Sequence, residues 1–154
     1  MVEIERKFLV KEFPSRVVYG VKSFVQGYMT ESHAGTTVRV RMAGDKSALT
    51  IKGASGPSGL SRVEYEIPVE EITAFKMLND LCRGRIILKK RYLVQYHGHT
   101  WELDVFDSKL KGLMLAEIEL KSEDEEFEMP EWVGNEVTGN PEYTNAYLAF
   151  QAGD

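Results

Sequence analysis

The chain has 154 residues, of which 43% are hydrophobic and 28% are charged, and its formal net charge is −5 with a pI of about 5.3. This length suits a single domain over residues 1–154 with room for a sizeable core. No stretch approaches the roughly 18 apolar residues that a membrane helix needs. Lys and Arg do not gather into the basic runs of a nucleic-acid binder. The composition therefore indicates a globular protein with no nucleic-acid partner and no membrane partner.

Two features of the sequence indicate a cytoplasmic location. A charged motif begins two residues after Met1, which leaves no space for a cleavable signal peptide. Cys82 is the only cysteine, so no internal disulfide bond can form.

Eight segments alternate polar and apolar residues with the period of two that is typical of β-strands. They cover residues 3–10, 23–30, 36–42, 48–52, 62–68, 86–96, 100–106 and 113–121. Short turn-forming stretches join many of them, so we expect antiparallel pairing. Between the fifth and sixth strands, apolar residues recur at three- and four-residue intervals, at Val69, Ile72, Phe75, Leu78 and Cys82. This spacing predicts an amphipathic helix over residues 69–82 that covers an apolar face of the sheet.

The chain changes character after the last predicted strand. An acidic run at residues 123–128 predicts a solvated helix face. Asn140 followed by Pro141 is a helix-start signal, because an Asn side chain caps free amides and proline suits the first helical position. We therefore expect a last helix from this point through Ala149.

Charged side chains occupy one face of most predicted strands. Residues two apart on a strand share a face, because successive side chains point to opposite sides. The ionic face carries Glu3, Glu5, Lys7, Arg39, Arg41, Lys52, Arg62, Glu64, Glu66, Lys89, Arg91, Glu102, Asp104, Glu117, Glu119 and Lys121. The apolar face carries Val38, Val40, Leu49, Ile51, Val63, Tyr65, Ile67, Trp101, Leu103, Val105, Ile118 and Leu120.

Two architectures accommodate such a sheet. In the first, helices cover the apolar face and water wets the ionic face, whose charges serve solubility and cross-strand pairing. In the second, eight strands close into a barrel whose ionic interior holds one small ligand. The ionic positions contain almost no Ser, Thr, Asn or Gln, and arginine and carboxylates predominate over lysine, which favours the closed barrel. An interior with both signs of charge suits a polyanion bridged by divalent cations.

The charged motifs follow one another in a fixed order along the chain. They are Glu3-x-Glu5-x-Lys7, Arg39-x-Arg41, Lys52, Glu64-x-Glu66, Lys89-x-Arg91, Glu102-x-Asp104 and Glu117-x-Glu119, with Gln26-Gly27-Tyr28, Glu136-Val137-Thr138, Tyr143 and Asn145 as softer matches. Together they resemble the CYTH superfamily, also called the triphosphate tunnel metalloenzymes, and are similar to its small bacterial members. The resemblance implies a predominantly β (α+β) fold. Its core is a closed eight-stranded antiparallel β-barrel, the triphosphate tunnel, with a helix after the fifth strand and C-terminal helices.

The resemblance also implies roles for the charged residues, and the chemistry of their side chains agrees. Guanidinium groups are planar forks that match paired phosphate oxygens, ammonium groups act as point charges, and carboxylates suit Mg²⁺ or Mn²⁺. We assign substrate binding to Lys7, Arg39, Arg41, Lys52, Lys89 and Arg91, and we expect two metal ions on Glu3, Glu5, Glu117 and Glu119. Catalysis, by holding the second ion or orienting the attacking water, is assigned to Glu64, Glu66, Glu102, Asp104 and Glu117. Which carboxylate orients the water stays open.

Phosphoryl transfer depends on positioning and charge stabilisation, so no nucleophilic side chain is required. The resemblance implies metal-dependent hydrolysis of a triphosphate, and we expect inorganic tripolyphosphate to be cleaved to pyrophosphate and phosphate. Nucleoside or thiamine triphosphate hydrolysis, adenylate cyclase activity and a non-catalytic polyphosphate-binding module are the alternatives. No aromatic residue is clearly placed to stack on a ring, because Trp101 is out of phase with Glu102 and Trp132 follows the last strand. A homodimer is one alternative for the oligomeric state.

Histidines and the cysteine have simpler interpretations. His33, His97 and His99 lie in predicted turns, where exposed histidines are far more common than a transition-metal site. Cys82 lies on the apolar stripe of the predicted helix, so we expect it to pack rather than react.

Three further side chains lie near the predicted site. Arg62 and Lys121 share the ionic face, and we expect each to pair with a carboxylate at its rim. Tyr28 either donates a hydrogen bond to a phosphate or positions the C-terminal helix, and the sequence leaves both alternatives open.

Overall fold

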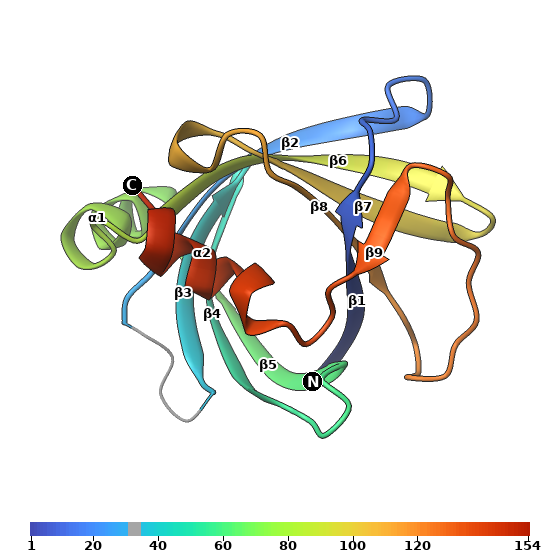
Figure 1. The fold of residues 1–154 in the computed structure, drawn as a ribbon. Helices are drawn as coiled ribbons and strands as arrows, with labels where there is room; N and C mark the ends of the chain where they lie inside the picture. Colours follow the sequence, from blue (N-terminus) through green and yellow to red (C-terminus); the bar gives the residue numbers. More distant parts are fainter. Residues whose placement is uncertain (31–34) are drawn as a thin grey trace.

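The computed structural model describes residues 1–30 and 35–154, and its strands form one closed antiparallel barrel (Figure 1). The described elements are β1 (Val2–Val10), β2 (Val18–Tyr28), β3 (Thr37–Ala43), β4 (Lys46–Ser55), β5 (Ser61–Pro68), α1 (Glu71–Leu81), β6 (Ile86–Tyr96), β7 (His99–Phe106), η1 (Ser108–Leu110), β8 (Met114–Glu119), β9 (Val133–Glu136), η2 (Pro141–Tyr143) and α2 (Asn145–Ala152). The predicted turn histidine His33 lies outside the described residues. Within the described part of the chain, no helix is both long and apolar enough to cross a membrane.

Eight strands follow one another around the barrel in the order β5, β4, β3, β2, β6, β7, β8 and β1, and β1 returns to β5. The predicted closed eight-stranded barrel is therefore confirmed. β1 pairs through residues 5–9 with β8 on one edge. On its other edge, β1 pairs through residues 2–4 with β5 and near its end with the additional strand β9. β9 was not predicted, because its four residues are too short to show a period.

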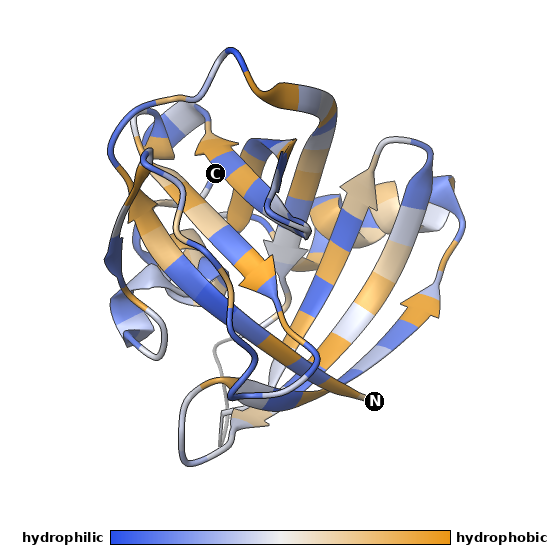
Figure 2. Cartoon of the chain, turned by 90° about the vertical axis from the view of Figure 1, so that its right-hand side faces the viewer, coloured by the Kyte–Doolittle hydropathy of each residue, from blue (hydrophilic) through white to orange (hydrophobic). Residues whose placement is uncertain are grey.

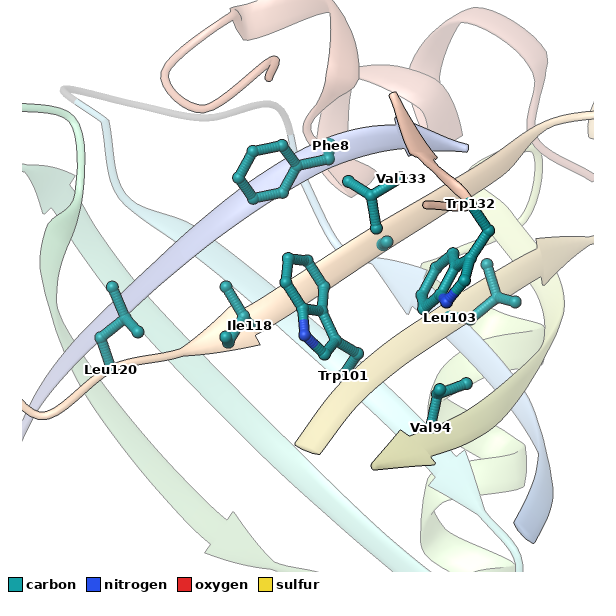
Figure 3. Packing of buried hydrophobic residues seen from close by; sticks show 9 residues of the cluster. Phe8, Val94, Trp101, Leu103, Ile118, Leu120, Trp132 and Val133 are labelled. Atoms are coloured by element: carbon teal, nitrogen blue, oxygen red, sulfur yellow. The ribbon is translucent and has the colours of Figure 1, made fainter. Parts of the chain in front are cut away.

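Figure 2 shows hydrophilic and hydrophobic residues alternating along the strands, as expected for a barrel with two different faces. The outer face of β1, β6, β7 and β8 is covered by the chain that follows β8. We call its buried residues the outer-face cluster: Phe8, Val94, Trp101, Leu103, Ala116, Ile118, Leu120, Trp132 and Val133 (Figure 3). Trp101 is fully buried there and, as expected, points away from the interior.

The prediction of a helix over residues 123–128 is wrong, because this segment is irregular and lies across the outer-face cluster. Phe127 packs within it, with its ring centroid 5.7 Å from Trp101 and 6.2 Å from Phe8. Instead of the expected helix, this segment is irregular and packs the Phe127 side chain against the barrel.

Helix α1 covers the outer face of β2, β3 and β4, in a second cluster that we call the helix cluster. Its buried residues are Val40, Ala74, Leu78 and Cys82. The expected packing role of Cys82 is confirmed. The predicted stripe is wrong at Ile72 and Phe75, which are 57% and 59% exposed, because the buried side of α1 is set by Ala74 and Leu78.

α1 leaves part of the apolar face uncovered. Val63, Tyr65 and Ile67 on the outer face of β5 are all exposed, because α1 contacts β3 and β4. The expectation that one helix covers the apolar face therefore fails at β5.

The C-terminal segment packs against one end of the barrel (Figure 1) in a third cluster, the end cluster. Its buried residues are Tyr28, Ile87, Phe106, Leu115 and Ala149. The single predicted helix is two: the Asn140 side chain accepts the Glu142 amide at the start of η2, and Thr144 accepts the Tyr147 amide at the start of α2. Two caps four residues apart thus set a short turn of 3-10 helix before α2.

β2 starts five residues earlier than predicted. A β-bulge between Val18 and Gly20 shifts its register against β6 and breaks the period of two. Strand pairing therefore extends beyond the segment whose alternation is visible.

Candidate active site

A cavity of about 600 Å³ lies between the inner faces of β1, β3 and β4 and the C-terminal segment. Four predicted site residues line it: Glu5, Lys7, Arg39 and Lys52. Three of these four carry a positive charge. The cavity therefore presents cations beside one carboxylate, as a site for an anion with a bound metal ion requires.

Lys89, Arg91 and Asp104 lie deeper, in a buried ion-pair network. Lys89 Nζ is 2.6 Å from Asp104 Oδ2, and the Arg91 guanidinium donates to both Asp104 oxygens at 2.7 and 2.9 Å. Burial lowers the pKa of Lys89 to about 8. Burial raises the pKa of Asp104, but Lys89 and Arg91 outweigh it and hold that pKa below its usual value. The pKa of Arg91 is raised despite burial, because Asp104 attracts its charge.

Glu117 connects this network to the cavity. Its Oε1 lies 3.7 Å from Lys7 Nζ, and its side chain is buried. Burial raises the pKa of Glu117, but the nearby Lys7 and Arg91 charges lower it well below its usual value. The pKa of Glu5 is raised well above its usual value, first by burial and then by the negative charge of Glu117. The two carboxylates therefore repel, and a cation between them would relieve the repulsion.

Glu3, Lys52 and Glu64 form a second group beside the cavity. Lys52 Nζ lies 2.7 Å from Glu3 Oε2 and 3.9 Å from Glu64 Oε2. Burial raises the pKa of Glu3, but Lys52 outweighs it and lowers the net value. The pKa of Glu64 is raised by burial and by its hydrogen bond with Glu3. The Lys52 charge is thus shared between two carboxylates.

Arg39 and Arg41 follow β3 on its inner face. An Arg39 terminal nitrogen donates to Thr50 Oγ1 at 3.2 Å, whereas Arg39 Nε is buried and has no partner among the described residues. A terminal nitrogen of Arg41 lies 3.8 Å from Glu66 Oε1, and burial, then repulsion by Arg39, lowers the pKa of Arg41 to about 10. Both guanidinium groups therefore have capacity to bind an anion.

Glu102 and Glu119 lie by another cavity of about 530 Å³ that Lys121 and Glu125 also line. Arg91 donates to Glu102 Oε2 at 3.0 Å, and burial raises the pKa of Glu102. Glu119 is exposed, although its Cα lies opposite that of Glu5 in the β1–β8 ladder. The structure therefore brings the predicted carboxylates to two regions of the barrel.

The prediction that Arg62 pairs with a carboxylate is wrong, because its guanidinium donates to the carbonyl oxygens of Gly53 and Gly35 at 3.0 and 3.4 Å. Arg62 lines the 600 Å³ cavity and so belongs to the site. Lys121 is exposed, and its backbone amide donates to Glu125 Oε1.

His97 occupies the predicted turn and lies 3.1 Å from Glu128, both side chains being exposed. His99 instead begins β7, and its Nε2 lies 2.6 Å from Glu125 Oε2, so the expectation of an exposed turn residue is wrong there. Among residues 1–30 and 35–154, no group of three or more His, Cys, Asp and Glu side chains is arranged to hold a metal ion.

Sequence reasoning singled out Tyr28 and Tyr143 but missed two further aromatic side chains at the cavity, Tyr147 and Phe150. Tyr28, Tyr143, Tyr147 and Phe150 line it, so the expectation that no aromatic is clearly placed to stack on a ring is wrong. Tyr28 also packs in the end cluster with Ala149, which fits the alternative that it positions the C-terminal helix. Tyr28 and the C-terminal aromatic residues are not part of an alternating charge pattern in the sequence. Only the folded structure brings them to the cavity.

The C-terminal segment also contacts two of the predicted cations. Lys7 Nζ donates to the Tyr143 carbonyl at 2.9 Å, and Lys89 Nζ donates to Asn145 Oδ1 at 3.2 Å. Thr138 Oγ1 accepts the Lys7 amide at 2.8 Å. These contacts place the segment that follows β9 beside the ionic interior.

A divalent metal ion fits the donor set of Glu5 and Glu117. Mg²⁺ in phosphate-handling sites is held by one or two carboxylates, with substrate oxygens and water completing the coordination. Glu5, which lines the anion cavity, and the buried Glu117 repel each other and supply these two carboxylates without a third protein ligand.

Comparison with known proteins agrees with this geometry. The CYTH domain matches residues 1–145. The chain is 42% identical over 146 residues to the inorganic triphosphatase of Acetivibrio thermocellus, which covers 95% of this chain and 92% of that protein. It is also 42% identical over 153 residues to the inorganic triphosphatase of Nitrosomonas europaea, which covers 97% and 98% of the two chains.

Solved structures share the barrel. A crystal structure of an inorganic triphosphatase has a TM-score of 0.70 at 38% identity, and the match covers 96% of this chain and 94% of that chain. A Pyrococcus horikoshii protein has a TM-score of 0.61 at 21% identity, covering 78% and 79% of the two chains, and this likeness concerns the fold alone. The family match extends over nearly the whole sequence, and the chain belongs to the CYTH domain family.

Proposed function

We propose that this protein is a metal-dependent triphosphatase that hydrolyses inorganic tripolyphosphate to pyrophosphate and phosphate. The observation that carries the proposal is the cavity in which Lys7, Arg39 and Lys52 meet Glu5, in front of the buried Glu117. The similarity to inorganic triphosphatases over nearly the full chain supports the same substrate.

Cations that line the cavity bind the substrate. Arg39 offers an unpartnered buried Nε–H to a phosphate oxygen, and Lys7 and Lys52 add point charges. Arg41, Lys89 and Arg91 lie behind them, where their charges add to substrate binding and neutralise the charge that spreads over the phosphate oxygens during transfer.

Carboxylates divide into two roles. Glu5 and Glu117 hold the first divalent ion, with Glu3 and Glu119 beside Glu5 on β1 and β8. Glu64, Glu66, Glu102, Asp104 and Glu117 orient water or support a second ion. When bound, Mg²⁺ or Mn²⁺ lowers the pKa of a coordinated water and neutralises phosphate charge. Glu64 lies beside the substrate cation Lys52, with its Oε2 3.9 Å from Lys52 Nζ.

A second candidate substrate is a triphosphate that carries an organic group, such as a nucleoside or thiamine triphosphate. Tyr143, Tyr147 and Phe150 line the same cavity as the cations, and aromatic faces suit stacking on a ring. This observation favours testing such substrates beside tripolyphosphate.

One assay tests the function. Phosphate release from tripolyphosphate, ATP, thiamine triphosphate and pyrophosphate is measured with Mg²⁺, with Mn²⁺ and with chelator, and products are identified. We expect the highest kcat/KM for tripolyphosphate and no activity in chelator. Full activity in chelator contradicts the metal-dependent mechanism, a cyclic product from ATP indicates a cyclase, and binding without turnover indicates a polyphosphate-binding module.

Arg39→Ala is the matching loss-of-function variant, and Lys90→Ala is its control. Lys90 lies on the exposed outer side of β6, between Lys89 and Arg91. We expect Arg39→Ala to raise KM and lower kcat, because its charge is used both in binding and in the transition state. Lys90→Ala should match the wild type.

The cellular location of the protein stays a prediction. The lone, buried Cys82 favours a reducing compartment such as the cytoplasm. A single domain and the absence of a nucleic-acid or membrane partner also stay predictions.

A homodimer stays a prediction as well. The exposed apolar face of β5, with Tyr65 and Ile67, supports a homodimer, and sedimentation velocity measures the oligomeric state directly.

A further inference from the structure

Phe24 is a buried aromatic residue in an ionic neighbourhood. It lies on β2, with Lys89 of β6 opposite it on one side and Ala43 of β3 on the other. The residue is 6% exposed. Among the described residues, Phe24 is the only buried apolar side chain outside the outer-face, helix and end clusters. Packing against other apolar residues therefore does not account for its position.

Three interior cations gather on this one ring. The Cζ atoms of Arg41 and Arg91 each lie 4.8 Å from the Phe24 ring centroid, and Lys89 Nζ lies 5.6 Å from it. The face of an aromatic ring carries negative partial charge and attracts cations at these distances. Phe24 thus attracts three like charges that repel one another.

The three cations differ in what else holds them. Arg91 and Lys89 both form short ion pairs with the buried Asp104. Arg41 has a longer contact of 3.8 Å with Glu66, whose side chain is 49% exposed. Arg39 and Arg91 repel the Arg41 charge. Arg41 is therefore the cation whose position depends most on the ring.

We propose that Phe24 is a positioning residue, whose ring holds the Arg41 guanidinium at the place where it meets the triphosphate. This inference rests on the proposed function, since it assigns Arg41 to substrate binding. Without the ring, Arg41 turns toward the exposed Glu66, and substrate must reorder it on binding. The loss appears as weaker substrate binding, because a disordered side chain must be fixed in the complex.

A double-mutant cycle tests this proposal. KM and kcat for tripolyphosphate are measured for wild type, Phe24→Leu, Arg41→Ala and the double variant. We expect Phe24→Leu alone to raise KM by about tenfold, the size of a desolvated cation–π contact. In the Arg41→Ala background, Phe24→Leu should add almost nothing, because the residue through which it acts is gone. Effects that multiply would show that Phe24 acts on the barrel generally and would overturn the proposal.

Three further variants serve as controls for the role of the Phe24 ring. Phe24→Tyr keeps the ring and should retain a KM near the wild-type value. Phe24→Met replaces the ring by a flexible side chain, should reproduce the Phe24→Leu defect, and serves if that variant does not fold. Phe127→Leu removes a ring on the outer face that carries Arg6 at 5.0 Å, and it should leave KM unchanged. A Phe24→Tyr variant as defective as Phe24→Leu contradicts the positioning role.

The same variants are titrated with tripolyphosphate in chelator by calorimetry, which measures binding without turnover. If the wild type binds tripolyphosphate in chelator but does not hydrolyse it with Mg²⁺ or Mn²⁺, the proposed function fails, and the double-mutant cycle is still read from Kd. If it binds and the two substitutions multiply, only the role of Phe24 fails. A wild type that neither binds nor hydrolyses tripolyphosphate overturns both.

Discussion

Individual charged side chains in this barrel depend on one another for their ionisation. Asp104 is the clearest case, because its side chain is 1% exposed and two cations donate to its two oxygens. Such a group is costly to bury alone, and its partners are equally costly to leave without it. Lys89 and Arg91 therefore keep their charges in the interior through a single carboxylate.

Replacing Asp104 by Asn should destabilise the protein strongly. The substitution leaves two buried cations short of a counter-charge, and we expect the free energy of unfolding to fall by about 3–5 kcal/mol. Urea denaturation measures the loss. Glu136→Gln, which breaks the half-exposed Arg6–Glu136 pair, is the control and should cost no more than about 1 kcal/mol. Equal losses for the two variants would contradict the buried network.

Substrate affinity should fall as pH rises from 7 to 9, because Lys89 has a pKa of about 8 in the folded protein and loses its charge in this window. Its folded pKa lies below the unfolded value of about 10.4, so the unfolded chain binds more protons between these values. The Lys89 contribution to stability therefore rises with pH across this window while binding weakens.

KM measured at both pH values for wild type and Lys89→Arg checks this expectation, because ionisation of the substrate itself is common to the two proteins. The arginine stays charged, so its KM should change less. Lys89→Met, which is neutral at every pH, should show high KM throughout and serves if the larger arginine does not fit. Equal pH dependence in all three proteins would exclude Lys89 as the titrating group.

At the scale of single elements, the distance between α1 and the barrel depends on a glycine of β2, which has no side chain. Gly27 lies under the helix, and a Cβ built there would come within 2.6 Å of the Cys82 Cβ and 2.9 Å of Leu78 Cδ2. Real carbon atoms do not approach so closely, so only glycine permits this distance between α1 and the barrel.

Gly27→Ala should therefore push α1 outward and destabilise the protein by about 1–3 kcal/mol. Thermal unfolding followed by circular dichroism measures this as a fall of roughly 2–12 °C in Tm. Gly20→Ala on the same strand is the control, because its nearest neighbour would be Leu93 at 3.6 Å, an ordinary contact. A Gly27→Ala protein as stable as Gly20→Ala would show that α1 moves without cost.

The strands and their inner faces were predictable because a period of two assigns each side chain to one face. The motif from Glu3 to Lys7 is the simplest example. The period does not predict how deep in the barrel each inward side chain lies. Arg39 and Lys89 both point inward, yet Arg39 lines the cavity and Lys89 is held by Asp104.

The remaining errors also have physical causes. Ile72 matched a helical period, but a period locates only a stripe, and tertiary packing chose Ala74 and Leu78 as the buried side. Phe24 belongs to the inner face by alternation with Gln26 and Tyr28, so its location could have been found. Its three cations come from other strands, and only strand pairing brings them together.

Across the whole molecule, like charges repel one another at two places in the barrel interior. Arg39 and Arg41 follow each other on β3, and on β8 Glu117 repels Glu5 across the ladder. A ligand that supplies phosphate and metal together relieves both kinds of repulsion at once. The barrel is therefore expected to be more stable with ligand than without it.

Tripolyphosphate with Mg²⁺ should raise Tm, because a ligand that binds only the folded state stabilises it by mass action. At a ligand concentration of 100 times Kd the gain is about 2.7 kcal/mol, or roughly 5–10 °C for a chain of this length. Differential scanning fluorimetry with and without ligand measures the shift, and Arg39→Ala should show a smaller one at equal concentration. An unchanged Tm at saturating ligand would mean that water, rather than ligand, satisfies the ionic face.

The pairing of β1 with the distant strands β8 and β9 has a consequence for synthesis on the ribosome. β1 is the first strand to emerge, yet Glu5 and Phe8 pair with residues 119 and 136. Residues 5–10 of β1 must wait for these partners while more than a hundred residues are translated, whereas β2 to β5 can form their hairpins and β5 can pair with residues 2–4 in the meantime. Contacts so distant in sequence form slowly, and an unpaired strand edge invites association with other chains. A nascent chain arrested before β8 should therefore engage chaperones through β1, whereas translation through β8 and β9 lets the barrel close.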